Sequence, residues 1–324
     1  MKKLAVLGVD IGGTKTLCLL VDHKRRILGS AKFKTAPEAG PSKFKADLLR
    51  ALKSLEGQAH ASGRRLIGAG VGCAGVVDRK RGAIKTAPNL VSLEGFLVGP
   101  LLEKAFGTRV VLGNDVQFGL AAEHHLGAAQ GYSQVLGIFF GTGVGGAAIL
   151  DGRIYRGASG MGGQVGAVLA HPLGGPEAAL SHGILDRVAS KAAIASEALV
   201  LAVKNWAPYL HTKVGTDLAK VTWGMLHRAI RHGDRRIEEM LRARMRVVGI
   251  ALASVVNFLN PQMMVLGGGL MDEMPRLVLG EIEAGMREYL VPEVSDALRV
   301  RPAQLGGNAV ALGAANAALE KWLG

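Results

Sequence analysis

The chain has 324 residues, 49% of them hydrophobic, with a formal net charge of +13. This length favours two domains with a large buried core. No apolar run reaches the length of a membrane span, and the two cysteines, Cys18 and Cys73, cannot build a structural zinc site by themselves. The composition therefore predicts a cytoplasmic α/β protein from a reducing compartment, without a membrane partner.

The positive charge is gathered in three sequence clusters, at residues 23–26, 79–81 and 228–246. Nucleic-acid binding is one interpretation of such clusters. They are scattered, however, and no aromatic residues lie within them. We therefore expect solvated faces that attract phosphorylated small molecules, and no nucleic-acid partner.

The first motif is a hairpin near the N-terminus. Residues 4–9 and 17–21 are apolar β-type runs, and the turn between them contains Asp10, Gly12, Gly13, Thr14 and Lys15. Glycines let a backbone approach a ligand closely, and successive N–H groups in such a turn can bind an anion. Asp10 ends the first run and could hold Mg²⁺ through water. The residues alone leave two interpretations, a phosphate-binding hairpin or an ordinary Gly-Gly hairpin.

Strand and helix patterns alternate through the rest of the first half, as is typical of an α/β fold. The predicted strands cover residues 27–33, 65–72, 83–89 (a short strand and a bend) and 109–112, and the predicted helices cover residues 42–62, 101–106 and 116–127.

The pattern begins again at residue 134, with a strand over 134–140, a glycine turn, and a second strand over 147–150. Segments 7–14 and 136–142 share this plan at an offset of 129 residues, which indicates an internal duplication. Beyond an irregular glycine-rich stretch at 157–175, the remaining predicted helices cover 184–203, 234–258 and 309–322, and the remaining strands cover 263–266 and 298–302.

The second glycine turn satisfies the spacing G-x-G-x-x-G through Gly141, Gly143 and Gly146. A dinucleotide fingerprint needs a helix directly after the glycines, whereas residues 147–150 are predicted to form a strand. A second phosphate hairpin, with the Thr142 hydroxyl as a further ligand, fits better. The sequence contains no G-x-x-x-x-G-K-[ST] loop, which excludes a P-loop enzyme.

Two further motifs each have a structural and a functional interpretation. Asn114 and Asp115 stand between a strand and a helix, where they either cap the helix or provide a carboxylate that accepts a proton from a substrate hydroxyl. Gly267, Gly268 and Gly269 form either a plain strand-to-helix turn or a close approach to a purine or an α-phosphate.

Taken in order and spacing, these motifs resemble the ROK family (repressor, open reading frame, kinase), and the resemblance covers nearly the whole chain. It implies an α/β, actin-like and hexokinase-like (ribonuclease H-like) duplicated fold with two lobes around a cleft. The small lobe would comprise residues 1–115, completed by the helix at about 309–324, and the larger lobe residues 116–308. The motifs that carry the resemblance are residues 10–15, Gly75, 114–115, 141–146, 157–160, 267–269 and 305–309.

The resemblance also implies a glucokinase-like activity, with ATP- and Mg²⁺-dependent phosphorylation of a hexose or related sugar by a homodimer. Asp115 would be the general base. The implied sugar-binding residues are Gly75, Asn114, Asp115, Gln164 and Asp186. The implied nucleotide-binding residues are Asp10, Gly12, Gly13, Thr14, Lys15, Gly141, Thr142, Gly143, Gly267 and Gly268, and Asp10 would hold Mg²⁺ through water.

The chain departs from the family pattern at the sugar side. Family enzymes usually carry Glu-x-Gly-His where this chain has Gln164-Val-Gly-Ala167, and a further sugar-binding Glu corresponds to Asp186. The family's cysteine cluster is missing. We therefore expect no zinc site and an atypical sugar pocket, with His171 and His182 as surface or loop histidines and not as replacement ligands.

Two other functions remain open on these residues. A non-catalytic sugar or nucleotide sensor would explain the altered sugar side. A DNA-binding repressor of the same family is disfavoured, because only three residues precede the first hairpin. A donor other than ATP, such as polyphosphate, is a variant of the kinase hypothesis.

Overall fold

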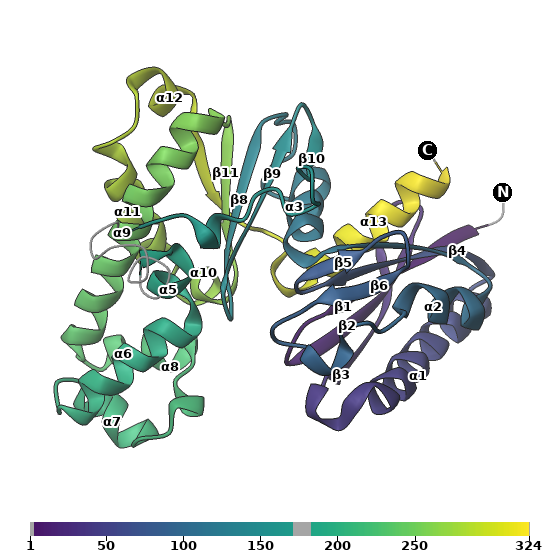
Figure 1. The fold of residues 1–324 in the computed structure, drawn as a ribbon, viewed down its shortest axis with the longest axis horizontal. Coiled ribbons are helices and arrows are strands. Elements are labelled where there is room, and N and C mark those ends of the chain that lie inside the picture. Colours follow the sequence, from purple (N-terminus) through teal and green to yellow (C-terminus); the bar gives the residue numbers. More distant parts are fainter. Residues whose placement is uncertain (1–2, 171–182, 324) are drawn as a thin grey trace. The chain divides into compact units, whose positions relative to one another are not determined.

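A computed structural model describes residues 3–170 and 183–323 (Figure 1). The chain divides into two compact units. Unit 1 comprises Met1–Gly127, Gly157–Met161 and Gly307–Gly324, and unit 2 comprises Ala128–Arg156 and Gly162–Gly306. His171 and His182 lie outside the described residues.

Unit 1 is built on a five-stranded sheet with the strand order β3-β2-β1-β4-β7. Strands β1, β2 and β3 are antiparallel neighbours, whereas β4 and β7 extend the sheet parallel to β1. The strands are β1 (Lys3–Ile11), β2 (Lys15–Asp22), β3 (Ile27–Lys34), β4 (Arg64–Cys73) and β7 (Arg109–Asn114). Because Asp10 pairs with Gly72 and Cys73 pairs with Asn114, the carboxyl ends of β1, β4 and β7 meet at one edge.

Helices cover both faces of this sheet. The α1 helix (Gly40–Ala61) packs Phe44, Leu48 and Leu52 against the β1 side chains Leu7 and Val9. The alternate residues Gly8 and Gly70 face α13 (Ala309–Leu323), where an added Cβ would collide with the carbonyl oxygens of Ala311 and Ala314. The remaining elements of unit 1 are β5 (Val76–Asp78), β6 (Ala83–Thr86), α2 (Val98–Phe106), α3 (Asp115–Leu126), η1 (Pro37–Ala39) and η2 (Val91–Leu93).

Unit 2 repeats the same sheet plan, with the order β10-β9-β8-β11-β12. Its first three strands are again antiparallel neighbours and its last two again extend the sheet in parallel. The strands are β8 (Val135–Phe140), β9 (Val144–Leu150), β10 (Arg153–Tyr155), β11 (Met263–Gly267) and β12 (Arg299–Pro302). The duplication predicted from the two glycine turns is therefore confirmed at the level of topology.

Helices form the rest of unit 2, and the longest, α9, buries Leu241, Val248 and Leu252 in the core. They are α5 (Leu185–Ala189), α6 (Lys191–Val203), α7 (Pro208–Val214), α8 (Trp223–Arg231), α9 (Arg235–Leu259), α10 (Gly269–Glu273), α11 (Pro275–Arg287) and α12 (Pro292–Ala297), with the short turns η3 (Val165–Ala167) and η5 (Leu218–Lys220). The short turn η6 (Gly306–Asn308) joins unit 2 to the last segment of unit 1. No helix in the described part of the chain is long and apolar enough to span a membrane.

Two differences between the structure and the predicted elements affect how the units are built. The helix expected over 184–203 is broken at Ser190, where ψ is 155° and the hydroxyl accepts a hydrogen bond from Ala193 N at 3.3 Å. The serine thus starts a new helix by capping it. The α3 helix, placed in the larger lobe by the sequence, belongs to unit 1, because Phe118 packs with Val111 and Ala314.

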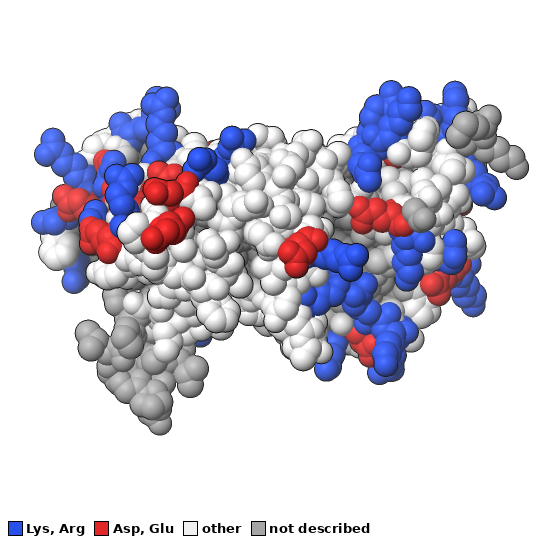
Figure 2. All heavy atoms as spheres, turned by 90° about the horizontal axis from the view of Figure 1, so that it is seen from above, with Lys and Arg blue, Asp and Glu red and all other residues white. Residues whose placement is uncertain are grey.

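The net positive charge lies mainly in unit 1, which has 21 Lys and Arg residues against 11 Asp and Glu, whereas unit 2 has 18 against 15. Figure 2 shows Lys and Arg side chains in separate groups on one face, with Asp and Glu side chains among them. Four of the five arginines on α9 form ion pairs with carboxylates, among them Arg236 with Glu239 and Arg242 with Glu238. The α9 cluster is therefore a solvated face of ion pairs.

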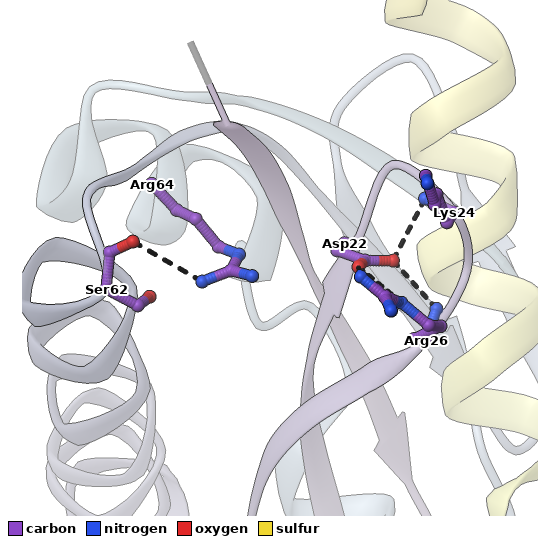
Figure 3. Close-up of polar contacts among 5 residues, drawn as sticks. All are labelled: Asp22, Lys24, Arg26, Ser62 and Arg64. Atoms are coloured by element: carbon purple, nitrogen blue, oxygen red, sulfur yellow. Dashed lines mark hydrogen bonds and ion pairs between the residues drawn. The ribbon is translucent and has the colours of Figure 1, made fainter.

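The basic hairpin at 23–26 is organised by one buried carboxylate (Figure 3). Asp22 Oδ1 accepts from the backbone N–H groups of Lys24 and Arg26, at 2.9 Å each, and Oδ2 accepts from Arg26 Nε at 2.9 Å. These bonds lower the pKa of Asp22, although its burial opposes them. Since Ala5 at the start of β1 pairs with Asp22, this hairpin lies at the opposite edge of the sheet from Asp10.

Candidate active site

The turn between β1 and β2 presents unused backbone donors. It is closed by a hydrogen bond from Gly12 N to Lys15 O at 3.1 Å. Within residues 3–170 and 183–323, the N–H groups of Gly13 and Thr14 have no acceptor, and Thr14 is exposed. Two consecutive N–H donors at a glycine turn suit a phosphate oxygen. This geometry favours the phosphate-hairpin interpretation of the sequence.

Two residues that the sequence analysis missed support this turn. Thr35, directly after β3, donates from its hydroxyl to Gly12 O at 2.6 Å and from its N–H to Thr14 O at 3.1 Å. On the other side, a Cβ on Gly13 would lie 2.9 Å from the Cβ of Asn89. The sequence shows Asn89 in a bend but contains no signal that joins either residue to the turn, since both contacts are non-local.

Asp10 and Asp115 form a pair of half-buried carboxylates. Asp10 lies near the end of β1, and Asp115 is the first residue of α3. The pKa of Asp10 is raised to about 7, mainly by burial and also by the charge of Asp115, while Lys15 opposes the rise. Burial also raises the pKa of Asp115 to about 6, against the hydrogen bonds donated by Val116 N, Asp115 N and the Asn114 side chain. The site therefore holds carboxyl groups that change protonation near neutral pH.

Asn114 holds Asp115 in place. Its Nδ2 donates to Gly75 O at 3.0 Å and to Asp115 Oδ1 at 2.9 Å, and its Oδ1 accepts from Gln117 N at 3.1 Å. Both Nδ2 hydrogens are therefore used, so Asn114 can only accept a further hydrogen bond. The capping interpretation is confirmed, and any contact with a sugar hydroxyl is limited to the remaining lone pair of Oδ1.

Gly75 is required by the same arrangement. Its φ is +112°, and an added Cβ would collide with Thr86 O and lie 2.9 Å from the Cα of Ala87. Only glycine fits both the backbone conformation and the space. The close approach brings the carbonyl of Gly75 to Asn114, so the structure joins these two predicted sugar-binding residues.

The residues at Asp10 fit a magnesium ion bound through water. The negative charge of Asp115 acts on Asp10, and Lys15 is the cation that opposes it. A divalent cation would neutralise such a pair, and Mg²⁺ usually keeps several of its waters. Among the residues that the structure describes, no three His, Cys, Asp or Glu side chains form a direct metal cage.

The glycine turn of unit 2 follows the same plan. Gly141 N donates to Gly143 O at 2.9 Å, and in the described part of the chain the N–H groups of Thr142 and Gly143 have no acceptor. The next N–H, from Val144, donates to Asp186 Oδ1 at 2.7 Å. Asp186 was expected to bind sugar; the structure shows that one of its oxygens also supports the glycine turn.

Gly267 and Gly268 lie beside this turn, at the carboxyl end of the neighbouring strand β11. Gly267 pairs with Phe139, and Gly268, with φ +90°, lies against the backbone of Phe140. Gly269 follows against the indole of Trp223, where an added Cβ would lie 2.9 Å from Cδ1. The structure thus brings together residues 141–144, Asp186 and 267–268 within unit 2.

A model of the ROK family matches residues 6–321 of the chain. The chain belongs to the ROK family. It is 28% identical over 322 residues to a glucokinase of Thermotoga maritima, with 99% of each chain covered. It is also similar to a solved ROK family glucokinase from Streptomyces griseus in complex with glucose and AMPPNP, with 29% identity, a TM-score of 0.80, and coverage of 98% of this chain and 99% of that one.

The family also contains regulators. The DNA-binding transcriptional dual regulator NagC of Escherichia coli is 27% identical over 278 residues, which is 86% of this chain and 66% of NagC. The two sheets of this ROK chain have the duplicated α/β topology of the actin-like, hexokinase-like fold, as the family resemblance implied.

The altered residues of this ROK chain lie around η3. Gln164 and Ala167 are exposed at either side of the turn, and between them Gly166 packs so closely on the carbonyl of Val144 that an added Cβ would collide with it. The segment that contains Gln164 therefore packs against the unit 2 glycine turn, which Asp186 also supports. Ala167 has no side-chain donor atom, so it cannot replace a histidine ligand.

Proposed function

We propose that this ROK protein is a sugar kinase that uses ATP and Mg²⁺ to phosphorylate a hydroxyl of a hexose or related sugar. The observation that carries the proposal is the state of Asp115, a half-buried carboxylate with a pKa raised to about 6, held by Asn114 at the sheet edge that also ends in Asp10 and the phosphate turn. The similarity to glucokinases over the full chain supports the same activity.

Asp115 is the general base in this proposal. Its carboxylate accepts the proton of a sugar hydroxyl as the hydroxyl oxygen forms a bond to the γ-phosphorus, and the bond between the γ-phosphorus and the β–γ bridging oxygen breaks to release ADP. The hydrogen bond from Asn114 to Oδ1 orients the carboxylate toward its substrate. When bound near Asp10, Mg²⁺ would neutralise charge on the phosphates.

The backbone donors hold the nucleotide. The N–H groups of Gly13 and Thr14, and those of Thr142 and Gly143 in unit 2, suit phosphate oxygens, with Lys15 as a cation. Gly267 and Gly268, at the carboxyl end of β11 beside the unit 2 turn, are the proposed contacts of the adenosine. Phosphoryl transfer depends mainly on such positioning and charge neutralisation.

The sugar side differs from that of the family's usual enzymes. We infer that Gly75, Asn114, Gln164 and Asp186 contact the sugar. An amide at Gln164 both donates and accepts, whereas a carboxylate only accepts, and Asp186 already gives one oxygen to Val144 N. The pocket should therefore select a different set of hydroxyls from a standard glucokinase, without zinc.

A panel of hexoses and N-acyl hexosamines with Mg–ATP tests the proposed function. We expect turnover of at least one sugar by the purified, folded protein. Uniform inactivity across the panel would contradict it. Size-exclusion chromatography with light scattering of the same sample tests the expected homodimer.

A sensor without catalysis is the second candidate. The changes at Gln164 and Ala167, together with the similarity to NagC, favour it over other non-enzymatic functions. Calorimetric binding of a sugar without any phosphorylation would support the sensor, and measurable phosphotransfer would exclude it.

A further inference from the structure

Two buried hydroxyls lie directly behind the phosphate turn of unit 1. Thr16 and Thr35 are 0% and 2% exposed, and their Oγ1 atoms are 3.0 Å apart. Thr16 belongs to β2 and Thr35 follows β3, so strand pairing brings them together. Buried hydroxyls are costly unless they are hydrogen-bonded, which raises the question of what this pair supports.

The direction of the hydrogen bonds can be assigned. The single hydroxyl hydrogen of Thr35 is donated to Gly12 O at 2.6 Å, so Thr16 must be the donor in the bond between the two hydroxyls. Thr35 also donates its backbone N–H to Thr14 O at 3.1 Å. One residue therefore holds the two carbonyl groups on either side of Gly13.

The positions of these two carbonyl groups determine which N–H groups of the turn can face a ligand. A peptide group carries its C=O and the following N–H in opposite directions. With the carbonyls of Gly12 and Thr14 bonded to Thr35, the N–H of Gly13, which shares a peptide group with Gly12 O, is directed away from Thr35. Among the described residues, it is one of the two N–H groups of this turn that have no acceptor.

We propose that Thr35 is the positioning residue of the phosphate turn and that its hydroxyl keeps the turn in the form that binds the nucleotide's phosphates. Thr16 is the second member of the pair, and it supports Thr35 without contacting the turn carbonyls itself. The inference rests on the proposed function for the identity of the ligand, but not for the hydrogen bonds that hold the turn.

The test compares Thr35→Val with Thr16→Val, two changes that remove one buried hydroxyl each and keep the side-chain shape. We expect both variants to melt at lower temperature than the wild type. Only Thr35→Val should weaken binding of Mg–AMPPNP, by about tenfold, which corresponds to about 1.4 kcal/mol, because the change removes one hydrogen bond and frees the turn. The KM for the sugar should stay within about twofold of the wild-type value.

Thr35→Ser keeps the hydroxyl and should restore the nucleotide affinity. If Thr35→Val and Thr16→Val bound AMPPNP equally well, or if Thr35→Ser were as weak as Thr35→Val, Thr35 would be a structural residue only and the proposal would be wrong.

A second readout separates this inference from the proposed function. The Gly12 amide is protected by its bond to Lys15 O, and NMR-detected hydrogen exchange at Gly12 reports whether the turn is held. We expect faster exchange in Thr35→Val than in Thr16→Val. A wild-type protein that bound no nucleotide would contradict the proposed function, while equal exchange in the two variants would contradict the role of Thr35.

Discussion

At the scale of single residues, Asp115 has opposite effects on function and stability. Its pKa in the folded state is raised from 3.8 to about 6, mainly by burial. The folded protein therefore holds this proton more tightly than the unfolded chain does. Ionisation lowers the free energy of unfolding as the pH rises from about 4 through 6, and the loss is complete above that range.

Asp115→Asn should therefore stabilise the protein at pH 8, by on the order of 1 kcal/mol, and the gain should shrink as the pH falls toward 4. Thermal melts without nucleotide and with a chelator would measure it. Asp78→Asn is the matched control, because hydrogen bonds from Arg81 N and Lys80 N lower the pKa of the partly exposed Asp78, so this variant should lose stability at pH 8. If Asp115→Asn were less stable than the wild type at pH 8, the pKa of Asp115 would not be raised in the folded protein.

Asp186 should show two separable roles. Asp186→Asn keeps an oxygen for the Val144 N–H and should leave the nucleotide affinity close to wild type, while it raises the KM for the sugar. Asp186→Ala removes the bond to the turn and should weaken both. Calorimetry with Mg–AMPPNP and steady-state kinetics would measure the two effects. Equal nucleotide affinities in the two variants would show that the 2.7 Å bond does not support the turn.

At the scale of elements, the docking of α13 on the unit 1 sheet depends on glycines. Gly70→Ala should destabilise unit 1 by several kcal/mol, because the added Cβ collides with the backbone of Ala314. Gly57→Ala is the control: Gly57 lies in α1 with nothing within 4 Å of an added Cβ, so this change should raise the stability by about 0.5–1 kcal/mol. Denaturant unfolding would measure both, and a neutral Gly70→Ala would contradict the packing.

The sequence predicted many of the long elements and the motifs, since apolar periodicity marks β1, β4, β8 and α9 directly, but it predicted neither α8 nor α11. It did not predict the break at Ser190, where a local cap overrides helical periodicity, or the short strands β5 and β10. It also missed Thr35 and Asn89, because their contacts with the turn join residues far apart in the chain. Local motifs identify the residues that bind a ligand. The residues that keep those motifs in place are determined by tertiary structure.

At the scale of the whole molecule, the excess positive charge lies in unit 1, which also carries the phosphate turn. The electrostatic field of this excess charge should attract anionic nucleotides and have no effect on a neutral sugar. We expect the association rate of Mg–AMPPNP, measured by stopped flow, to fall as salt rises from 50 to about 500 mM, in line with screening. The association rate of a neutral hexose is the control, and an equal salt dependence for both ligands would exclude steering.

The most direct test of the central claim is phosphoryl transfer by Asp115→Asn, followed by ³¹P NMR of the sugar phosphate formed from Mg–ATP. Losing a general base should lower kcat by about 10²–10⁴-fold, with nucleotide affinity retained, while Asp78→Asn keeps wild-type turnover. If Asp115→Asn formed product within tenfold of the wild-type rate, this carboxylate would not be the base, and the proposed mechanism would be wrong.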